Sequence, residues 1–245
     1  MKKLLAIGTA VLAGALVADT VESSNTFGVL KVTPSSTTDG SETVICVPWV
    51  DAGTTGEGQS IQVKNVVKTS NLKNGSELLQ YVRSSKTYNG WVLTDGVWTG
   101  ATSVTANGVA AASNDSATLS RGDALIIRTS WPENATDKNI YLYGQYQSTG
   151  IGTQTLTAKA WNLIAPPTPT NEAVALSSMT WANVNANDYM YVQTAAGRRI
   201  TLTWSGTAWQ YNKPTGASTT EAVIQPGQGA WYVSTGDTAP TVTFN

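Results

Sequence analysis

The chain has 245 residues, a formal net charge of −1 and 13% charged residues, well below the share of about 25% typical of soluble domains. It contains no histidine and one cysteine, Cys46, which excludes a Ser-His-Asp relay, an imidazole metal site, an intrachain disulfide and a Cys-cluster zinc site. Without a block of basic residues, the composition also argues against nucleic acid as the main partner.

The N-terminus has the layout of a bacterial export signal. Lys2-Lys3 forms a positive start, and the apolar run Leu4–Val17 follows it and ends in small residues. This run is too short for the roughly 20 residues that a membrane-spanning helix needs. We therefore expect a signal peptide at residues 1–18, with cleavage after Ala15 and cleavage after Ala18 both left open. The mature protein is expected to lack a membrane span and to be secreted or on the cell surface, with the periplasm also open.

The rest of the chain predicts β-strands almost throughout. Short apolar or alternating runs rich in Val, Ile, Thr, Tyr and Trp recur, separated by turn pairs such as Asp95-Gly96 and Ser205-Gly206. Cys46 lies in one such run, which favours a buried core residue over a reactive thiol. The expected strands are Phe27–Thr33, Thr43–Trp49, Ser60–Val67, Glu77–Arg83, Gly90–Thr94, Ala124–Ser130, Ile140–Tyr146, Gln154–Ile164, Tyr189–Gln193, Ile200–Trp204, Ala208–Tyr211, Glu221–Ile224, Ala230–Ser234 and Thr241–Phe244.

Helical periodicity is weak in the mature chain. Leu72–Val82 and Ser177–Val184 each leave room for one short turn of helix, and Ala106–Ala117 for a loop or a helical turn. No longer stretch has the 3.6-residue period of a surface helix. The pattern therefore predicts an all-β fold.

The two halves of the chain match each other in four blocks that occur in the same order. The offsets between matched blocks are 118, 111, 111 and 105 residues, and they drift in one direction, as differences in loop length would produce. We therefore predict two tandem, duplicated antiparallel units, sandwich-like or barrel-like, that pack together at 19–150 and 151–245. Whether they share one core is left open. The matched blocks are Thr43–Trp49 with Trp161–Pro167, Glu77–Val82 with Asp188–Gln193, Asp95–Trp98 with Gly206–Trp209, and Ala117–Ile127 with Ala222–Tyr232.

The second unit carries a recognisable set of motifs. Trp161-Asn-Leu-Ile-Ala-Pro-Pro is followed by Trp209 and Tyr211, and then by Pro226-Gly-Gln-Gly-Ala-Trp-Tyr. This resembles a family of exported and surface bacterial β-repeat proteins with the pattern W-N-L-I-x-x-P … P-G-x-G-x-W/F. The resemblance covers most of 155–245 and, more weakly, 40–147, where Arg121-Gly-Asp replaces the glycine block. It implies export and a β-repeat, and because the family has no assigned chemistry, it implies no catalytic residue.

Tryptophan and tyrosine must supply the bulky core side chains, because the chain has nine of each and only two phenylalanines. Trp98 and Trp209 occupy matching places in the two units, and so, approximately, do Trp49 and Trp161. A residue that recurs in this way favours a role in the core.

Five other aromatic residues are the candidates for binding a ligand. Trp91, Trp131 and Trp181 have no counterpart in the other unit and are expected to be exposed. Trp231 and Tyr232 are adjacent in a strand, so their side chains point to opposite faces and one of them is expected to point outward. Exposed aromatic rings on a β scaffold suit stacking on sugar rings, although packing within the protein is the more common role of such residues.

The remaining motifs favour ordinary structural roles. Pro226–Gly229 lacks the Lys, Ser/Thr and helix of a phosphate-binding loop and favours a turn. Arg121-Gly-Asp123, a tripeptide that adhesion receptors bind, occupies the matching turn. The loop carboxylates neither form an identifiable catalytic pair nor have the spacing of a calcium loop. We therefore expect no catalytic, cofactor-binding or metal-binding residue. These carboxylates are Asp115, Asp123, Glu133 and Asp137.

Three functions follow from these features. The favoured hypothesis is a non-enzymatic, exported structural or surface protein of a layer, filament or matrix, which associates with itself through edge strands such as Gly28–Val32 and Thr241–Phe244. The alternative is a carbohydrate-binding or adhesion module that uses exposed Trp and Tyr. An enzyme, such as a glycosidase or lyase that acts through carboxylate, Tyr and Lys/Arg, is the least favoured.

Overall fold

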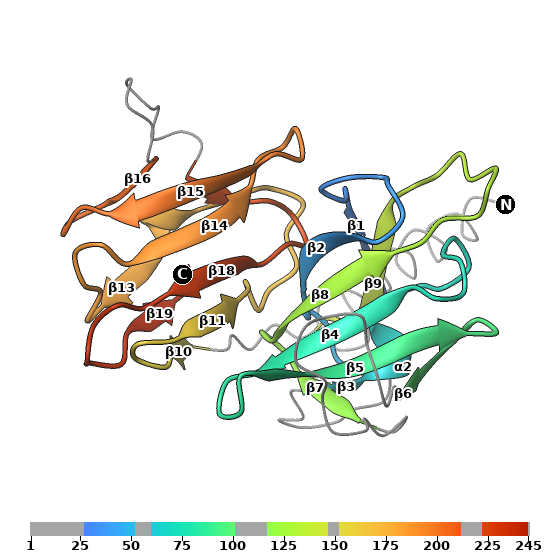
Figure 1. Cartoon of the computed structure of the whole chain (residues 1–245), viewed down its shortest axis with the longest axis horizontal. Coiled ribbons are helices and arrows are strands. Elements are labelled where there is room, and N and C mark those ends of the chain that lie inside the picture. Colours follow the sequence, from blue (N-terminus) through green and yellow to red (C-terminus); the bar gives the residue numbers. More distant parts are fainter. Residues whose placement is uncertain (1–26, 52–59, 101–116, 147–151, 212–221, 245) are drawn as a thin grey trace, which may run out of the picture.

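The computed structural model describes residues 27–51, 60–100, 117–146, 152–211 and 222–244. The expected signal peptide at 1–18 and residues 106–116 lie outside this part. The described chain is almost entirely β, as the sequence predicts (Figure 1). Within it, no helix is long and apolar enough to cross a membrane.

The first half of the chain forms one main sheet of five antiparallel strands. Their spatial order is β2 (Ser41–Cys46), β8 (Ala124–Thr129), β4 (Glu77–Val82), β5 (Thr87–Thr94) and β6 (Val97–Gly100). Two ribbons accompany it: β1 (Phe27–Val32) with β9 (Ile140–Gln145), and β3 (Ser60–Gln62) with β7 (Thr118–Ser120). The short helix α2 (Val63–Val66) follows β3 directly.

The second half has a corresponding set of strands. Its main sheet has the order β11 (Trp161–Ile164), β18 (Ala230–Val233), β14 (Tyr189–Gln193), β15 (Arg199–Trp204) and β16 (Trp209–Tyr211). A three-stranded sheet has the order β10 (Thr153–Thr155), β19 (Thr241–Thr243) and β13 (Thr180–Ala182). A further ribbon pairs β12 (Val174–Ala175) with β17 (Val223–Ile224). The 3-10 turn η1 (Leu176–Ser178) follows β12 directly along the chain.

The two main sheets have the same topology. In each, the strand that comes first along the chain lies at one edge, the last strand pairs with it, and the remaining three follow in chain order. The sequence blocks that match between the halves lie mostly on these equivalent strands. The shared topology is what a repeat would produce, and the duplication itself stays a prediction.

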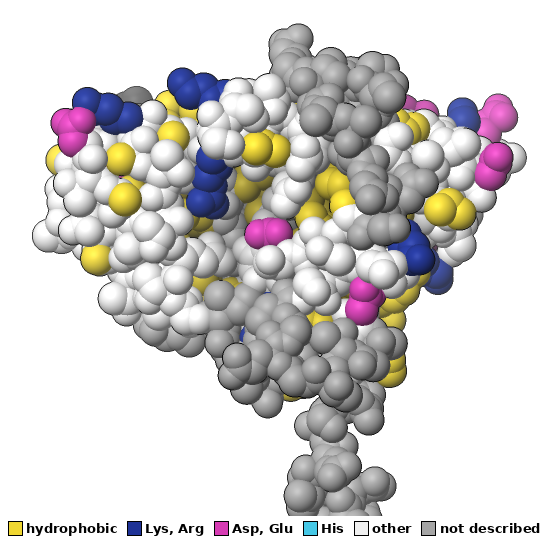
Figure 2. Space-filling view, turned by 90° about the horizontal axis from the view of Figure 1, so that it is seen from below, with side chains coloured by type: hydrophobic (Ala, Val, Ile, Leu, Met, Phe, Trp, Pro, Cys, Tyr) yellow, Lys and Arg dark blue, Asp and Glu magenta, His cyan; other side chains and the backbone are white. Residues whose placement is uncertain are grey.

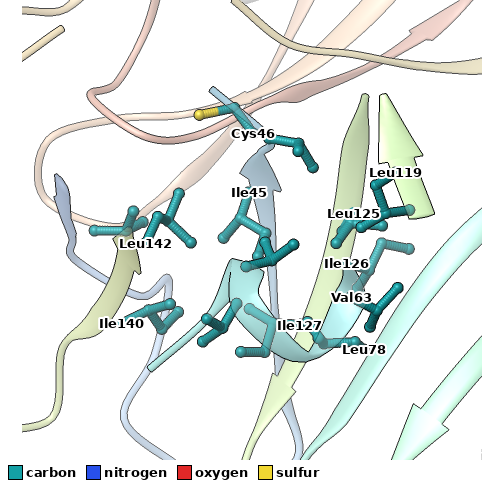
Figure 3. Packing of buried hydrophobic residues seen from close by; sticks show 14 of the residues in the cluster. Ile45, Cys46, Val63, Leu78, Leu119, Leu125, Ile126, Ile127, Ile140 and Leu142 are labelled. Atoms are coloured by element: carbon teal, nitrogen blue, oxygen red, sulfur yellow. The ribbon is translucent and has the colours of Figure 1, made fainter. Parts of the chain in front are cut away.

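Apolar side chains form two clusters, one mainly from each half. Figure 3 shows part of the first, in which Ile45, Ile127 and Leu142 from different strands are all fully buried. Leu163 and Ala165 of the second half belong to this first cluster. The two halves, which lie side by side in Figure 1, therefore share apolar packing.

The Pro226–Gly229 turn joins the second half to the first. The backbone N–H of Cys46 donates to the Gly227 carbonyl (2.9 Å), and the N–H of Gly229 donates to the Val44 carbonyl (3.1 Å). A Cβ on residue 229 would lie 2.6 Å from the Ile164 carbonyl oxygen, so glycine is required for this close approach. The motif is a turn, as expected, and it packs against β2.

Several expected elements differ from the structure. Ser60–Val67 is not one strand, because Val63 and Val66, three residues apart and both buried, form the inner side of α2. Gln154–Ile164 is divided into β10 and β11 by a turn in which Lys159 has a φ of 47°. Leu72–Val82 contains no helix, and its second part is β4.

Thr241–Phe244 was expected to be an edge strand, and this prediction is wrong. In the structure, β19 (Thr241–Thr243) pairs with β10 on one side and with β13 on the other. Its backbone groups are therefore used within the chain, and this strand has no free edge to offer to a second molecule.

Candidate functional site

Aromatic rings form a continuous row along one face of the molecule. Trp161 lies at its centre, stacked on Tyr191 with 5.8 Å between ring centroids and 13° between planes, and in edge contact with Trp231 at 5.6 Å. Trp231 in turn contacts Tyr81 at 5.3 Å. We define the aromatic row by its six residues, Tyr88, Tyr81, Trp231, Trp161, Tyr189 and Tyr191.

Strand alternation places these rings on a common face. Tyr191 and Trp231 are directly opposite each other on β14 and β18, and Leu163 of β11 is the other neighbour of Trp231. Tyr81 and Tyr88 form a cross-strand pair on β4 and β5 of the first half. The row therefore runs from the second sheet onto the first and crosses the junction of the halves.

A cleft of about 600 Å³ lies at this junction, and Tyr81 belongs to both the cleft and the row. We call it the junction cleft. Residues from both halves line it, and most of its side chains are polar. The polar and aromatic side chains of its wall include Gln80, Tyr81, Arg83, Asn89, Asp123 and Gln154.

Hydrogen bonds hold the polar side chains of the cleft in place. Arg83 donates from Nη2 to the Leu163 carbonyl (3.2 Å), and Gln154 donates from Nε2 to the Gly122 carbonyl (3.1 Å). Each of these bonds connects the two halves. The amide of Asn89 donates to Gln80 Oε1 (3.3 Å). These hydrogen bonds fix the orientation of the amide and guanidinium groups that line the cleft.

The charged groups of the cleft are partly shielded from water. Burial lowers the pKa of Arg83, an effect that the nearby Asp123 carboxylate opposes. Burial raises the pKa of Asp123, although the Ser120 N–H and Arg83 favour its charged form. Asp123 is the only carboxylate among the described residues that line the cleft.

Three of the five aromatic candidates are buried, and the expected exposure of Trp91 and Trp131 is therefore wrong. Trp91 is 1% and Trp131 2% exposed, and Tyr232 is fully buried. Trp91 faces inward from β5, and Tyr232 packs in the second core cluster, where it contacts Trp209 and Trp181. The absence of a counterpart in the other half did not indicate exposure, because the two cores are filled by different residues.

The other two candidates, Trp181 and Trp231, are half-buried. Trp231 is part of the aromatic row, on the opposite face of β18 from Tyr232, as the alternation predicts. Trp181 contacts Trp209 at 5.2 Å and lines a separate cavity. The structure does not bring these two tryptophans together.

The central residue of the row was missed from sequence. Trp161 was expected in the core because it matched Trp49, but it is 42% exposed, whereas Trp49 is buried. The match between Trp161 and Trp49 was approximate. Trp161 is the first residue of β11, and its side chain points to the opposite face of the strand from that of the buried Asn162. The period-two pattern Tyr189-x-Tyr191 was a usable signal for two further members of the row. Trp98 and Trp209 are buried, as predicted.

The remaining motifs do not form a site. Arg121 of the Arg-Gly-Asp sequence is 2% exposed, and Gly122 has a φ of 90° in a turn, so this tripeptide is not displayed for a receptor. Asp137 accepts a hydrogen bond from the Tyr141 hydroxyl (2.8 Å) at the surface. Within the described residues no group of three or more His, Cys, Asp or Glu could hold a metal. Asp115 lies outside the described part.

Cys46 is buried and unpaired, as expected for a core residue. Burial raises the pKa of its thiol far above the usual range.

The chain matches no protein-family model, no curated protein and no solved structure. The resemblance to the exported β-repeat family stays a prediction.

Proposed function

We propose that this chain is a non-enzymatic, exported binding module for an extracellular glycan. The observation that carries the proposal is the aromatic row, whose rings contact one another in sequence across the junction of the two halves. The C–H face of a pyranose ring packs on such rings through dispersion and loss of apolar hydration. A row of rings suits a polymer better than a single sugar.

The junction cleft supports the same class of ligand. Sugar hydroxyls need donors and acceptors, and the amides of Gln80, Asn89 and Gln154 provide both. Tyr81 belongs to both the cleft and the row, whereas Gln80 and Asn89, a cross-strand pair on β4 and β5, line the cleft from the other face of these strands. An apolar surface with a few fixed polar groups at its end is the usual composition of a small-molecule site.

Charge argues against single-stranded nucleic acid, the other polymer that stacks on aromatic rings. Such sites combine stacking with a positively charged groove along the backbone. The chain has a net charge of −1, and on the face in Figure 2 charged side chains are scattered over a mostly uncharged surface. Because the chain has about as many acidic as basic residues, 16 and 15, an uncharged or weakly charged polysaccharide suits it better than a polyanion.

Retention of the protein in gels that contain a soluble polysaccharide tests the proposal. The panel is hydroxyethylcellulose, xyloglucan, laminarin, dextran and mannan. We expect at least one to slow migration, and Trp161→Ala to abolish the effect, because its ring is the centre of the row. Tyr143→Ala, which removes a 37% exposed ring on β9, is the control, and its retardation relative to a gel without polysaccharide should equal that of the parent. No retardation by any member would contradict the proposal.

A structural or surface role through self-association is the second candidate. It is supported by an apolar strip on the β1–β9 ribbon, where Phe27 is 61% and Val29 65% exposed, and Val29 lies opposite Tyr143. Among the described strands, β1 pairs only with β9, so its other edge is open. Sedimentation velocity over a wide concentration range should then show growing species that Val29→Lys removes; a monomer at every concentration would contradict this role.

A further inference from the structure

A second cavity lies on the opposite face of the second sheet from the aromatic row. Trp204 and Trp209 are directly opposite each other on β15 and β16, and alternation points them away from the face that carries Tyr189. The cavity has a volume of about 600 Å³, within the range of small-molecule sites. We call it the tryptophan cavity. Its large apolar wall residues are Leu176, Met179, Trp181, Trp204 and Trp209.

The indole rings of the cavity are held at fixed inclinations. Trp209 lies between Trp181, at 5.2 Å and 68°, and Trp204, at 5.3 Å and 61°. Trp181 is fixed further by a hydrogen bond from Nε1 to the Leu176 carbonyl (3.1 Å) and by stacking on Tyr232. The flat walls are therefore in place before any ligand arrives, which lowers the entropy cost of binding a ring.

The lining limits the ligand to an uncharged and mainly apolar molecule. None of the described residues that line the cavity is charged, and Ser177 and Thr207 are its only polar side chains. A sugar would leave most of its hydroxyl groups without partners, at a cost of about 1–3 kcal/mol for each one buried. A cation would find indole faces but no carboxylate in the lining.

The first half fills the corresponding place with its own chain. There α2 packs against β6, Val63 and Val66 are buried, and the indole N–H of Trp98 donates to the Val67 carbonyl (3.4 Å). In the second half the shorter η1 follows β12. The indole N–H of Trp209, which has the place of Trp98, has no hydrogen-bond partner among the described residues. The same strand order thus encloses a packed helix in one half and leaves a cavity in the other.

We propose that the tryptophan cavity binds an uncharged, apolar small molecule that contains a ring. The three inclined indoles contact the ring, and Leu176 and Met179 cover its edge. This site is separate from the glycan surface and does not depend on it, because the two lie on opposite faces of the sheet.

Toluene is the probe, and the side-chain N–H signals of the nine tryptophans in a ¹⁵N-labelled sample report binding. We expect saturable shifts of the signals of Trp181, Trp204 and Trp209, while those of the buried Trp91 and Trp98 stay in place. Glucose and tetramethylammonium should leave the three cavity signals unchanged. Saturable shifts of the three cavity signals with tetramethylammonium, or none with toluene up to its solubility, would overturn the proposal.

Two variants test the location of the site. Trp204→Ala removes one wall and should weaken toluene binding at least 10-fold, and Tyr143→Ala on the distant ribbon is the control. Ala175→Leu fills the cavity instead and should have the same effect if Trp204→Ala fails to fold. Unchanged toluene affinity in a folded variant would contradict the site. Sedimentation velocity with toluene excludes a second copy of the chain as the occupant if the protein sediments as a monomer.

Discussion

At the scale of the residue, exposure separates the tryptophans proposed to bind a glycan from those that pack in the core. Trp161 is 42% exposed, whereas Trp91 and Trp131 are within the first core cluster. A sequence gives the number of tryptophans but not the depth at which each one lies. Depth depends on which strands cover a given face, and this is set by pairings between residues far apart in the chain.

Asp188 is a fully buried carboxylate that fixes the second half. It accepts hydrogen bonds from the Tyr232 hydroxyl, from the Thr235 N–H (2.7 Å) and from the Asn185 N–H (2.9 Å). Burial and this contact with Asp188 raise the pKa of Tyr232 far above its usual range. The phenol therefore stabilises the fold only while it is protonated.

We expect Tyr232→Phe to lower the free energy of unfolding by about 1.5–3 kcal/mol near pH 7, the usual contribution of a hydrogen bond to a charged group. The unfolded phenol ionises near pH 10 while the folded one does not, so the contribution is complete below pH 10 and falls as the pH rises above it. Urea unfolding of both proteins from pH 7 to 11 should show the difference shrinking above pH 10. A difference that stays constant would contradict this account.

At the scale of the element, turns and their glycines connect the halves. Gly227 has a φ of 71°, and a Cβ there would lie 2.4 Å from Val32 Cγ2 in the first half. Gly96 has a similar φ of 79° in an open turn with nothing within 4 Å of such a Cβ. A residue with a side chain would have a strained backbone at both positions, and at position 227 it would also clash with the first half.

Replacing each glycine by alanine separates these two effects. Gly96→Ala should lower the free energy of unfolding by about 1–2 kcal/mol through the left-handed backbone alone. Gly227→Ala should cost a further 1–3 kcal/mol or so, because the added methyl group overpacks the junction. Equal losses in the two variants, measured by urea unfolding, would show that the Pro226–Gly229 turn does not hold the halves together.

The strands were largely predictable, and the exceptions have physical causes. Runs such as Phe27–Thr33 and Ala124–Ser130 are rich in Val, Ile, Leu and Thr, and both correspond to strands with nearly the same bounds. Ser60–Val67 was misassigned because a short apolar run has no period that separates a strand from a turn of helix. The two-residue strand β12 leaves too little pattern to detect.

At the scale of the whole molecule, the all-β class agrees with the sequence analysis. The candidate site was only partly predictable. Trp231 was named from its alternation with Tyr232, but the row and the cleft combine β4 and β5 of one half with β11, β14 and β18 of the other. Contacts between halves are set by how their surfaces pack, and no local pattern encodes that.

The most direct test of glycan binding at the junction is the indole N–H spectrum of the ¹⁵N-labelled protein, recorded with an oligosaccharide of whichever polysaccharide retains it in gels. The account predicts that the signals of Trp161 and Trp231 shift together and saturate, while those of Trp91, Trp98 and Trp209 stay in place. Shifts confined to tryptophans outside the aromatic row, or no shift at saturating oligosaccharide, would contradict it.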